Sequence, residues 1–520
     1  MRKAWINAEI WNKEDTAFLT EDEHIVLTGT TEEVLAEADK DTEIIDLHRS
    51  FVTPGFIDTH LHLAGLGSFK NGVQLYQCKS VEELLERIRR KAETVHSGWI
   101  IARGYNEEYF DIPVRPTRQM LDEVSRDLPI AVIRTCGHVM SVNSKAMELA
   151  GINETTTVEG GKIDFEHGFM DENALSLIKG AYGNIDMNTL KEWIMLAAGE
   201  LNRFGITSCC SDDYVSVVKD WKMVTDAFMQ LSYQGKLNVR VSEQCEFESP
   251  QDLASFLDEG YTTGVGDDYF QIGPLKMICD GSLGAETAAM TKDYPDHPGE
   301  KGILIYEDED LDTYVQLANQ YNMPAICHAI GDRTLDQVLN TFEKYVLPGN
   351  PLHYGIVHCQ IMRPDQIQKV IDMNLDCYFQ SLFVDDDAQI LPQRVDEKLA
   401  ECSYPYRTLF HHVLAGNGSD APVTIPDALR GIYLAVTRRS TTTGDTMNPA
   451  ECLTVDEAIA SYTVNGAKLM GREDELGEIK AGMLADFTVM DKNLTKIPVE
   501  EILSTKILMT VSGGRIVYGE

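Results

Sequence analysis

The run Pro54-Gly55-Phe56-Ile57-Asp58-Thr59-His60-Leu61-His62 combines residue types and a spacing that could hold a metal ion. Side chains alternate between the two faces of a β-strand, so Asp58, His60 and His62 share one face and apolar residues share the other. An apolar outer face would pack on helices, and the inner face would end in two neighbouring imidazoles. Neutral imidazole is a ligand for zinc and related divalent ions. The spacing therefore predicts that His60 and His62 bind metal; two hydrogen-bonded structural histidines are the alternative.

Eight short β-rich runs, most of them separated by helical patterns, would position these residues. The predicted strands are Gly55–His62, Ile206–Cys210, Leu237–Gln244, Phe270–Asp280, Pro324–Ile330, Tyr354–Gln360, Leu375–Leu382 and Ala415–Asp420. The predicted helices between them are Asn188–Phe204, Ser216–Gln234, Pro250–Leu257, Leu311–Gln320, Thr334–Tyr345, Pro364–Met373 and Tyr404–Val413. This order predicts an α/β fold, a (β/α)8 TIM barrel whose active site lies at the C-terminal ends of the strands.

Two parts of the chain lie outside a plain barrel pattern. Residues 66–185 separate the first predicted strand from the helix that leads into the second, and a stretch of this length must form an inserted subdomain. Both ends of the chain carry further short β-patterns. We therefore expect a small β-sandwich domain composed of residues 1–54 and 478–520, with the barrel domain, residues 55–477, between its two halves.

The composition limits the classes of partner. Of the 520 residues, 43% are hydrophobic, enough to bury a large core. Forty-five Lys and Arg against 83 Asp and Glu give a net charge of −38, which argues against nucleic acid and anionic membranes as partners. The chain shows neither a signal-peptide core nor a run of about 18 apolar residues. Its eleven cysteines, without a Cys-x-x-Cys, fit a reduced, cytoplasmic protein.

Several further motifs follow Pro54–His62 in a fixed order. They are Asp280-Gly281-Ser282-Leu283-Gly284, His328-Ala329-Ile330-Gly331-Asp332, His358-Cys359-Gln360, Gly418-Ser419-Asp420-Ala421-Pro422-Val423 and Gly477–Phe487. Together they resemble the amidohydrolase superfamily of metal-dependent hydrolases, and within it the YtcJ-like or amidohydrolase-3 family, which includes N-substituted formamide deformylases. The resemblance covers nearly the whole chain. It implies metal ligands at the ends of barrel strands one, four, five, six and eight.

This resemblance assigns metal ligation to six residues: His60, His62, Lys276, His328, His358 and Asp420. Lys276 lies in an apolar strand, where burial disfavours the ammonium form. In binuclear members of the superfamily such a lysine reacts with CO2, and the resulting carbamate bridges two metals. The alternative for Lys276 is an ion pair with an acidic neighbour such as Asp280. His328 and His358 could instead be structural histidines of the core, and Asp420 could cap a helix.

The resemblance also implies a reaction. We expect an amidohydrolase that cleaves a non-peptide C–N bond, amide or formamide-like, in a small molecule. Two zinc ions per chain would form a binuclear centre bridged by carboxylated Lys276. A metal-activated hydroxide would attack the carbonyl carbon, and Asp420 would take its proton and pass it to the leaving amine.

Four residues are candidates for substrate contact: Tyr105, Asn106, His138 and Glu286. The first two belong to a family-like run in the inserted subdomain. His138 follows a predicted strand there and could polarise the substrate carbonyl, which makes it a second catalytic candidate beside Asp420; a loop-fixing histidine is the alternative. Glu286 stands where the family usually has Arg, so the preferred ligand charge could differ from that of relatives. Members often have Glu where this chain has Val357, which removes a possible partner of His358 but not the ligand itself.

Three alternatives remain open from the sequence, and one of them is aldolase or isomerase chemistry in which Lys276 forms a Schiff base without a metal. On the same fold, a mononuclear deaminase or cyclic-amidine hydrolase would leave Lys276 uncarboxylated and need one ion. A catalytically silent scaffold protein would keep the barrel without the chemistry, although such proteins lose ligands and all the expected positions are filled here. A homodimer is the commonest symmetric assembly and is the expected one.

Overall fold

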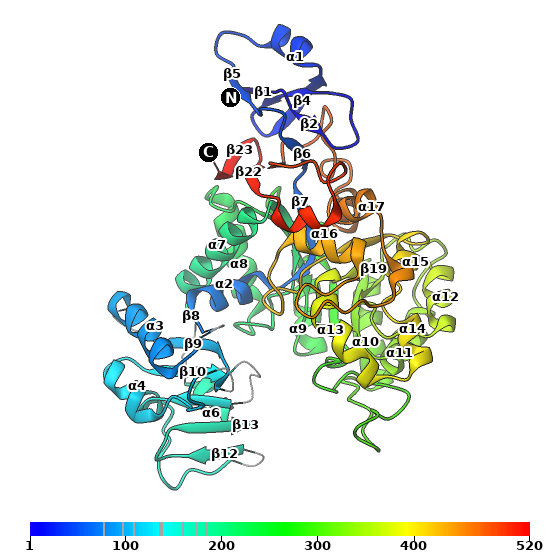
Figure 1. The fold of residues 1–520 in the computed structure, drawn as a ribbon. Coiled ribbons are helices and arrows are strands. Elements are labelled where there is room, and N and C mark those ends of the chain that lie inside the picture. Colours follow the sequence, from blue (N-terminus) through cyan, green and yellow to red (C-terminus); the bar gives the residue numbers. More distant parts are fainter. Residues whose placement is uncertain are drawn as a thin grey trace. The chain divides into compact units, whose positions relative to one another are not determined.

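The computed structural model describes residues 1–75, 78–95, 98–107, 110–134, 139–158, 161–172, 174–181 and 185–519 (Figure 1). The chain divides into two compact units, one formed by Met1–Gly65 with Ala197–Glu520 and the other by Leu66–Leu196. The larger unit contains the central parallel sheet and the sheets made from the two chain ends. No helix in the described ranges has both the length and the apolar character that crossing a bilayer requires.

Eight parallel strands form the central sheet, and each one begins within three residues of a strand predicted from the sequence. In spatial order they are β7 (Phe56–Leu61), β14 (Ile206–Ser211), β15 (Arg240–Cys245), β16 (Phe270–Ile278), β17 (Ala325–Ala329), β18 (Gly355–His358), β19 (Asp376–Phe379) and β20 (Ala415–Asn417). Every residue of β7, β14 and β15 is buried, as expected for strands with helices outside and packed side chains inside. The predicted TIM-barrel fold is confirmed.

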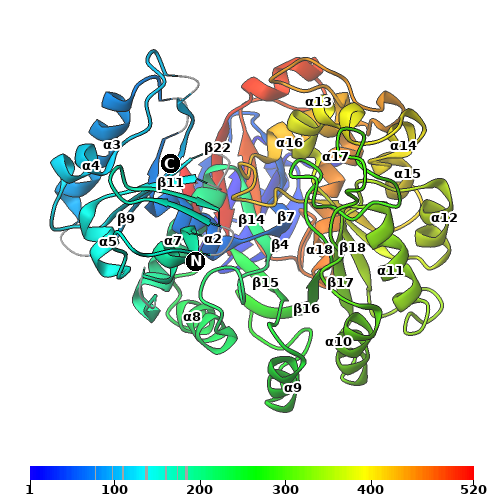
Figure 2. The same ribbon diagram turned by 90° about the horizontal axis from the view of Figure 1, so that it is seen from below.

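Helices follow the strands and lie outside them; Figure 2 shows α8 to α12 around β14 to β18. The helices that follow the barrel strands are α7 (Met187–Arg203), α8 (Trp221–Tyr233), α9 (Pro250–Asp258), α10 (Asp308–Gln320), α11 (Asp332–Phe342), α12 (Pro364–Asp372), α13 (Val384–Arg394), α14 (Glu397–Cys402), α15 (Tyr406–Phe410), α16 (Ala428–Thr437), α17 (Val455–Ser461) and α18 (Val464–Leu469). Helix α8 starts later than the sequence pattern predicts because the Asp220 side chain accepts from Met223 N and caps it there.

The barrel is closed by contacts just beyond the ends of its first and last strands. Asp420 N donates to His60 O at 2.7 Å, and His62 N donates to Ala421 O at 2.8 Å. Gly418 makes this approach possible, because a Cβ atom at that position would lie 2.5 Å from His60 N. Closure therefore brings the segment after β20 alongside β7.

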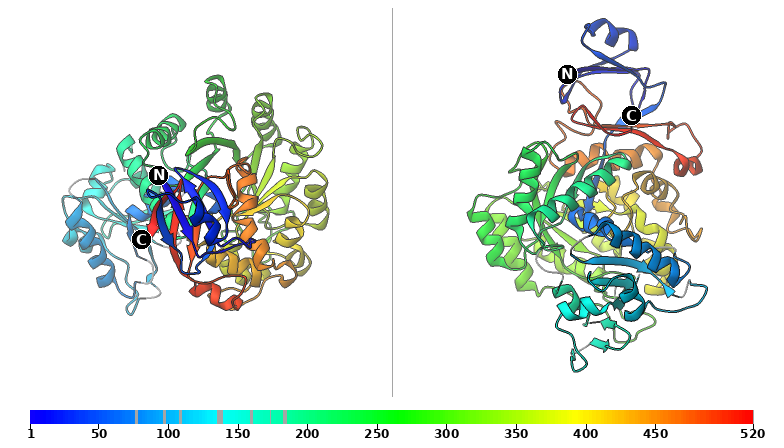
Figure 3. Two further views of the ribbon diagram at one scale, coloured as in Figure 1. Left: turned by 90° about the horizontal axis from the view of Figure 1, so that it is seen from above. Right: turned by 90° about the vertical axis from the view of Figure 1, so that its left-hand side faces the viewer.

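The two chain ends form two sheets that face each other. One contains β1 (Arg2–Ile6), β3 (Ala17–Glu21), β4 (His24–Gly29) and β5 (Glu43–Asp46); the other contains β2 (Glu9–Ile10), β6 (Phe51–Pro54), β21 (Phe487–Met490), β22 (Ile507–Ser512) and β23 (Arg515–Gly519). The N-terminal and C-terminal strands lie together in both views of Figure 3. Trp5 and Phe18 of the first sheet pack edge-on against Phe487 of the second, with centroids 4.8 and 4.9 Å apart. Helix α1 (Thr31–Glu37) and the short helix η4 (Val499–Ser504) complete this region.

The unit Leu66–Leu196 has a sheet of its own. Its strands, in spatial order, are β12 (Gly161–Asp164), β13 (Phe169–Glu172), β11 (Val139–Val142), β10 (Ile130–Arg134), β9 (Ile100–Tyr105) and β8 (Val73–Gln74). The accompanying helices are α2 (Leu63–Asn71), α3 (Val81–Thr94), α4 (Arg118–Val124), α5 (Ser144–Leu149) and α6 (Leu175–Gly180). Its hydrophobic clusters join residues of this sheet to residues of α3 and α4 or of α5 and α6, so the unit has its own core.

Candidate metal centre

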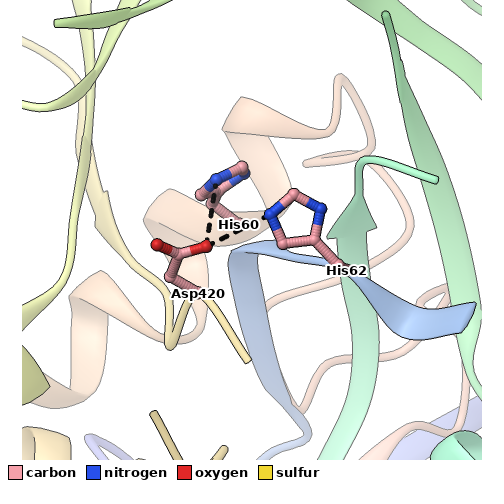
Figure 4. A group of neighbouring side chains, drawn as sticks. All are labelled: His60, His62 and Asp420. Carbon is pink, nitrogen blue, oxygen red and sulfur yellow. Dashed lines mark ion pairs between the residues drawn. The ribbon is translucent and has the colours of Figure 1, made fainter. Parts of the chain in front are cut away.

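His60, His62 and Asp420 converge at the C-terminal end of the barrel (Figure 4). The ligand atoms of the three side chains all lie within 4.8 Å of one another. His60 Nε2 is 3.5 Å and His62 Nε2 is 3.3 Å from Asp420 Oδ1. One ion placed between these atoms would be reached by two imidazole nitrogens and a carboxylate oxygen, a donor set that suits zinc and similar ions.

The hydrogen bonds of the first two rings fix which nitrogen faces the centre. Gln244 Nε2 donates to Thr59 O at 3.1 Å, which turns the amide oxygen toward His60, 2.6 Å from Nδ1. His62 Nδ1 lies 2.6 Å from the main-chain oxygen of Asp212. In both rings Nδ1 is therefore the donor and Nε2 is left as the ligand atom, the arrangement by which metal-binding histidines are oriented.

The two rings differ in their electrostatic surroundings. Burial, with a smaller contribution from the Lys276 charge, holds the pKa of His60 well below its usual value, so this imidazole is neutral. Burial also acts to lower the pKa of His62, but the hydrogen bond to Asp420 and the charge of Asp212 outweigh it and raise that pKa to about 9.

Asp420 owes its position to the closure of the barrel and to an unusual backbone conformation. Its φ angle is +56°, in the left-handed region that non-glycine residues rarely adopt, and His358 has a φ of +83°. Each such residue costs about 1–3 kcal/mol and persists only when the surrounding structure holds it. Two metal-ligand candidates thus share a feature that is frequent at functional sites.

His358 and His328 continue the row of imidazoles across β17 and β18. The His358 ring centroid lies 5.5 Å from that of His60 and 4.4 Å from that of His328. Gln380 repeats the role of Gln244: its Nε2 donates to Tyr378 O, and its Oε1 lies 2.7 Å from His358 Nδ1. His328 is held by the other nitrogen: its Nε2 lies 3.0 Å from Gly281 O, so Nδ1 is the candidate ligand atom of this ring.

Lys276 is buried and paired with a carboxylate that the sequence did not single out. Its Nζ lies 3.1 Å from Asp212 Oδ2, and both side chains are almost fully excluded from solvent. Burial lowers the pKa of Lys276, but the charges of Asp212 and Glu246 outweigh it, so the net shift is upward. The expected downward shift is wrong for the amine in this state. The alternative of an acidic partner holds, but the partner is Asp212 and not Asp280.

Asp280 has a structural role instead. Its carboxylate accepts hydrogen bonds from the backbone of Ala289, Ile330 and Gly331, and from the hydroxyl of Thr334. Oδ1 also lies 3.2 Å from His328 Nε2. Asp280 therefore ties together the loops that follow β16 and β17 and helps to orient one candidate ligand.

Three of the four substrate-contact candidates lie among the described residues. Glu286, after β16, pairs with Arg394 at 3.1 Å and with His297. Tyr105 is fully buried in the core of the unit Leu66–Leu196, and Asn106 Oδ1 accepts from Arg134 Nη2 within that unit. His138 lies outside the described residues. A substrate role for these four stays a prediction.

Three residues of the centre escaped the sequence analysis: Asp212, Gln244 and Gln380. Asp212 and Gln244 come at or just after the end of a predicted strand, and Gln380 directly follows β19, where a barrel places its catalytic groups. Asp212 is the second polar residue after Cys209-Cys210, and Gln244 is the last residue of its predicted strand. The same rule that selected His328 and His358 could have selected them.

The residues present fit a divalent ion. The Nε2 atoms of His60 and His62 both face Asp420 Oδ1, which supplies an anionic oxygen to the same point. In addition, the buried Asp212 Oδ1 has no hydrogen-bond partner among the described residues, which leaves one further anionic oxygen beside the centre. Buried charge of this kind is stabilised by a cation.

A (β/α)8 barrel whose strand ends gather imidazoles and a carboxylate is the architecture of a metal-dependent hydrolase. The chain belongs to the amidohydrolase family, whose model, described as "Amidohydrolase family", matches residues 43–518. It is 30% identical to YtcJ of Bacillus subtilis (strain 168) over 513 residues, covering 96% of each chain. It is 25% identical to the N-substituted formamide deformylase of Arthrobacter pascens, covering 96% of this chain and 94% of the relative.

A solved structure agrees with these relatives. An uncharacterized metal-dependent hydrolase from Pyrococcus furiosus superposes with a TM-score of 0.81 at 26% identity, over 95% of this chain and all of the other. The resemblance stated from the sequence is confirmed. The chain is a hydrolase of the amidohydrolase superfamily, and its relatives support a divalent metal.

Proposed function

We propose that this protein hydrolyses a non-peptide C–N bond, amide or formamide-like, in a small molecule. The convergence of His60, His62 and Asp420 at one point of the barrel mouth carries this proposal. The deformylase named above supports the bond type, because it is similar to this chain over nearly its full length. The compartment and the assembly, expected to be the cytoplasm and a homodimer, stay predictions.

Each residue of the centre has a definable task. A divalent ion bound there would supply acidity to a water molecule and polarise a carbonyl oxygen. His60 is uncharged, and His62 would offer an uncharged nitrogen once the ion displaces its proton, so both would bind without cancelling the positive charge. Asp420 Oδ1 faces the two imidazoles, and no described residue donates a hydrogen bond to Oδ2. Asp420 would accept a proton from the attacking water and return it to the leaving nitrogen as the C–O bond forms and the C–N bond breaks.

The number of ions divides the proposal into two forms. In the binuclear form, Lys276 would carry a carbamate derived from CO2, and the carbamate would hold a second zinc together with His328 and His358. In the mononuclear form, which suits a deaminase or a cyclic-amidine hydrolase, Lys276 remains an ammonium. The ion pair between Lys276 and Asp212 belongs to the uncarboxylated amine, and a carbamate at this position would face the Asp212 carboxylate. Metal content per chain separates the two.

The test combines elemental analysis with a library of amides, formamides and cyclic amidines. We expect one or two zinc equivalents per chain and turnover in one substrate class. Asp420→Asn should lower kcat by at least about 100-fold, the usual contribution of a positioned proton-transfer group. Asp445→Asn, the same change in an exposed loop, is the control.

Folding and metal content must be measured for the same samples. Circular dichroism should show a folded Asp420→Asn. If its activity falls only in proportion to lost zinc, Asp420 is a ligand and not the proton carrier. If the metal-loaded wild-type protein leaves every member of the library intact, the proposed reaction is wrong.

A further inference from the structure

Glu246 is a polar residue at the barrel mouth that the mechanism above does not use. It directly follows β15, whose Gln244 reaches inward to His60. Side chains two residues apart lie on the same face of a strand, so Glu246 continues the inward face at the C-terminal end. The pairing of Cys245 with Leu275 places Glu246 level with Lys276 on the neighbouring strand.

Its electrostatic neighbours agree with this placement. Burial and then the charge of Asp212 raise the pKa of Glu246 to about 7, and Lys276 and His62 act in the opposite direction. These are residues of the candidate centre, contributed by β14, β16 and β7 or by the residues just after them. Glu246 thus borders the centre without belonging to the convergent group of His60, His62 and Asp420.

Carboxylates outnumber cations at this edge of the centre. The ammonium of Lys276 bonds to Asp212 Oδ2, while the buried Asp212 Oδ1 is unpartnered among the described residues. Two further cations act on Glu246: His62, which faces Asp420 at 3.3 Å, and Lys219, which pairs with Glu248 at 2.6 Å. In the described ranges, no hydrogen bond or ion pair engages the half-buried carboxylate of Glu246. A positively charged ligand group would offset the repulsion between these carboxylates.

We propose that Glu246 binds a positively charged group of the substrate, so that the preferred substrates are amides carrying an ammonium or guanidinium group. This inference rests on the proposed function and narrows it. The ligand's N–H groups would donate charge-assisted hydrogen bonds to Glu246, which are shorter and stronger than neutral ones. Glu246 is a specificity residue in this proposal and takes no part in breaking the bond.

The first experiment compares two formamides of equal length on the zinc-loaded enzyme. N-(4-aminobutyl)formamide carries a terminal ammonium, and N-(4-hydroxybutyl)formamide replaces it with a hydroxyl. The ratio of their kcat/KM values should fall at least about tenfold in Glu246→Gln, as expected for loss of a charged hydrogen bond. Glu248→Gln, two residues away and paired with Lys219, should keep the wild-type ratio. An unchanged ratio in Glu246→Gln overturns the proposal.

A second measurement does not depend on turnover. Butylammonium should bind the wild-type protein at least about tenfold more tightly than butan-1-ol in calorimetry, and this preference should be lost in Glu246→Gln. If neither formamide is hydrolysed, the proposed reaction fails, while this binding comparison still decides the role of Glu246. A preference that survives in the variant overturns the inference, and so does a loss of zinc from Glu246→Gln, because Glu246 would then be a metal ligand.

Discussion

At the scale of residues, the centre depends on side-chain amides as much as on ligands. Gln244 and Gln380 each donate to a main-chain carbonyl, which leaves the amide oxygen pointing at Nδ1 of His60 or His358. An amide oxygen holds the ring without adding charge, and burial keeps both imidazoles neutral. Two uncharged ligands in a dry site retain the full positive charge of a bound ion.

The pair between Asp212 and Lys276 gives a prediction at this scale. Asp212→Asn would leave a buried ammonium without its counter-ion, and we expect a loss of about 3 kcal/mol in the free energy of unfolding. The main-chain oxygen of Asp212 still holds His62, so zinc content should be retained. Urea denaturation and elemental analysis measure the two effects.

Asp376→Asn is the matched control for this variant. Asp376 is also buried, but its partner His353 is about half exposed and can be hydrated when the pair is broken. The loss should therefore be clearly smaller than for Asp212→Asn. Equal losses in the free energy of unfolding would mean that the Lys276–Asp212 ion pair contributes no more to stability than the Asp376–His353 pair.

At the scale of elements, the site is created where the first and last barrel strands meet. Asp420 and His60 are 360 positions apart, yet the backbone hydrogen bond between them sets the distance from the carboxylate to the imidazoles. Asp58 reinforces the same junction, because its Oδ1 accepts from both Ser419 N and His60 N. The backbone contacts that close the barrel therefore also fix the positions of the candidate ligands His60 and Asp420.

Gly418→Ala tests this dependence. The added Cβ would lie 2.5 Å from His60 N and 2.9 Å from His60 O, both of which are backbone atoms that cannot move aside cheaply. We expect a destabilisation of about 1–3 kcal/mol, typical of overpacking, and at least a tenfold weaker affinity for zinc. Differential scanning calorimetry and a competitive zinc titration check both.

Gly199→Ala provides the comparison. Gly199 lies in α7, and a Cβ atom there meets nothing within 4 Å, so helix propensity should make this variant neutral or slightly stabilising. A Gly418→Ala protein with normal zinc affinity would show that closure and ligand placement are independent.

At the scale of the whole molecule, one buried ion pair joins the region built from the chain ends to the barrel. Arg240 begins β15, and its guanidinium makes two hydrogen bonds to Asp486, at 2.8 and 3.1 Å. The same Asp486 accepts from Gly513 N, and Arg240 lies over the ring of Tyr269 at 4.3 Å. The last 43 residues are thereby tied to the strand that carries Gln244 and precedes Glu246.

Asp486→Asn should weaken this connection. It removes the charge that neutralises a fully buried arginine, and we expect a loss of about 3–5 kcal/mol. A lower thermal midpoint, measured with zinc present and after chelation, checks the prediction. Asp491→Asn in the same segment, near the surface, should leave the midpoint unchanged; equal midpoints for both variants and the wild type would contradict the role of the pair.

The sequence by itself determined the barrel to a large extent, and it predicted the candidate ligands. Short apolar runs located β7, β16, β17, β18 and β20. Residue spacing singled out His60, and the resemblance to the amidohydrolase superfamily added Lys276, His328, His358 and Asp420 as candidate ligands. The pattern is local, because alternation and burial act over a few neighbouring residues. Residues of this kind can be found without knowing where the strands lie in space.

Only the tertiary structure decided which charges meet. Lys276 pairs with Asp212 and not with Asp280, and Glu286 pairs with Arg394, because such contacts depend on distances between segments far apart in the chain. The same holds for the closure that sets Asp420 beside His60 and for the register that puts Glu246 level with Lys276. The hydrophobic pattern of the sequence specifies the helices and strands. Coulomb and hydrogen-bond energies depend on the distances between atoms of different segments, and these distances are set only once the barrel has closed.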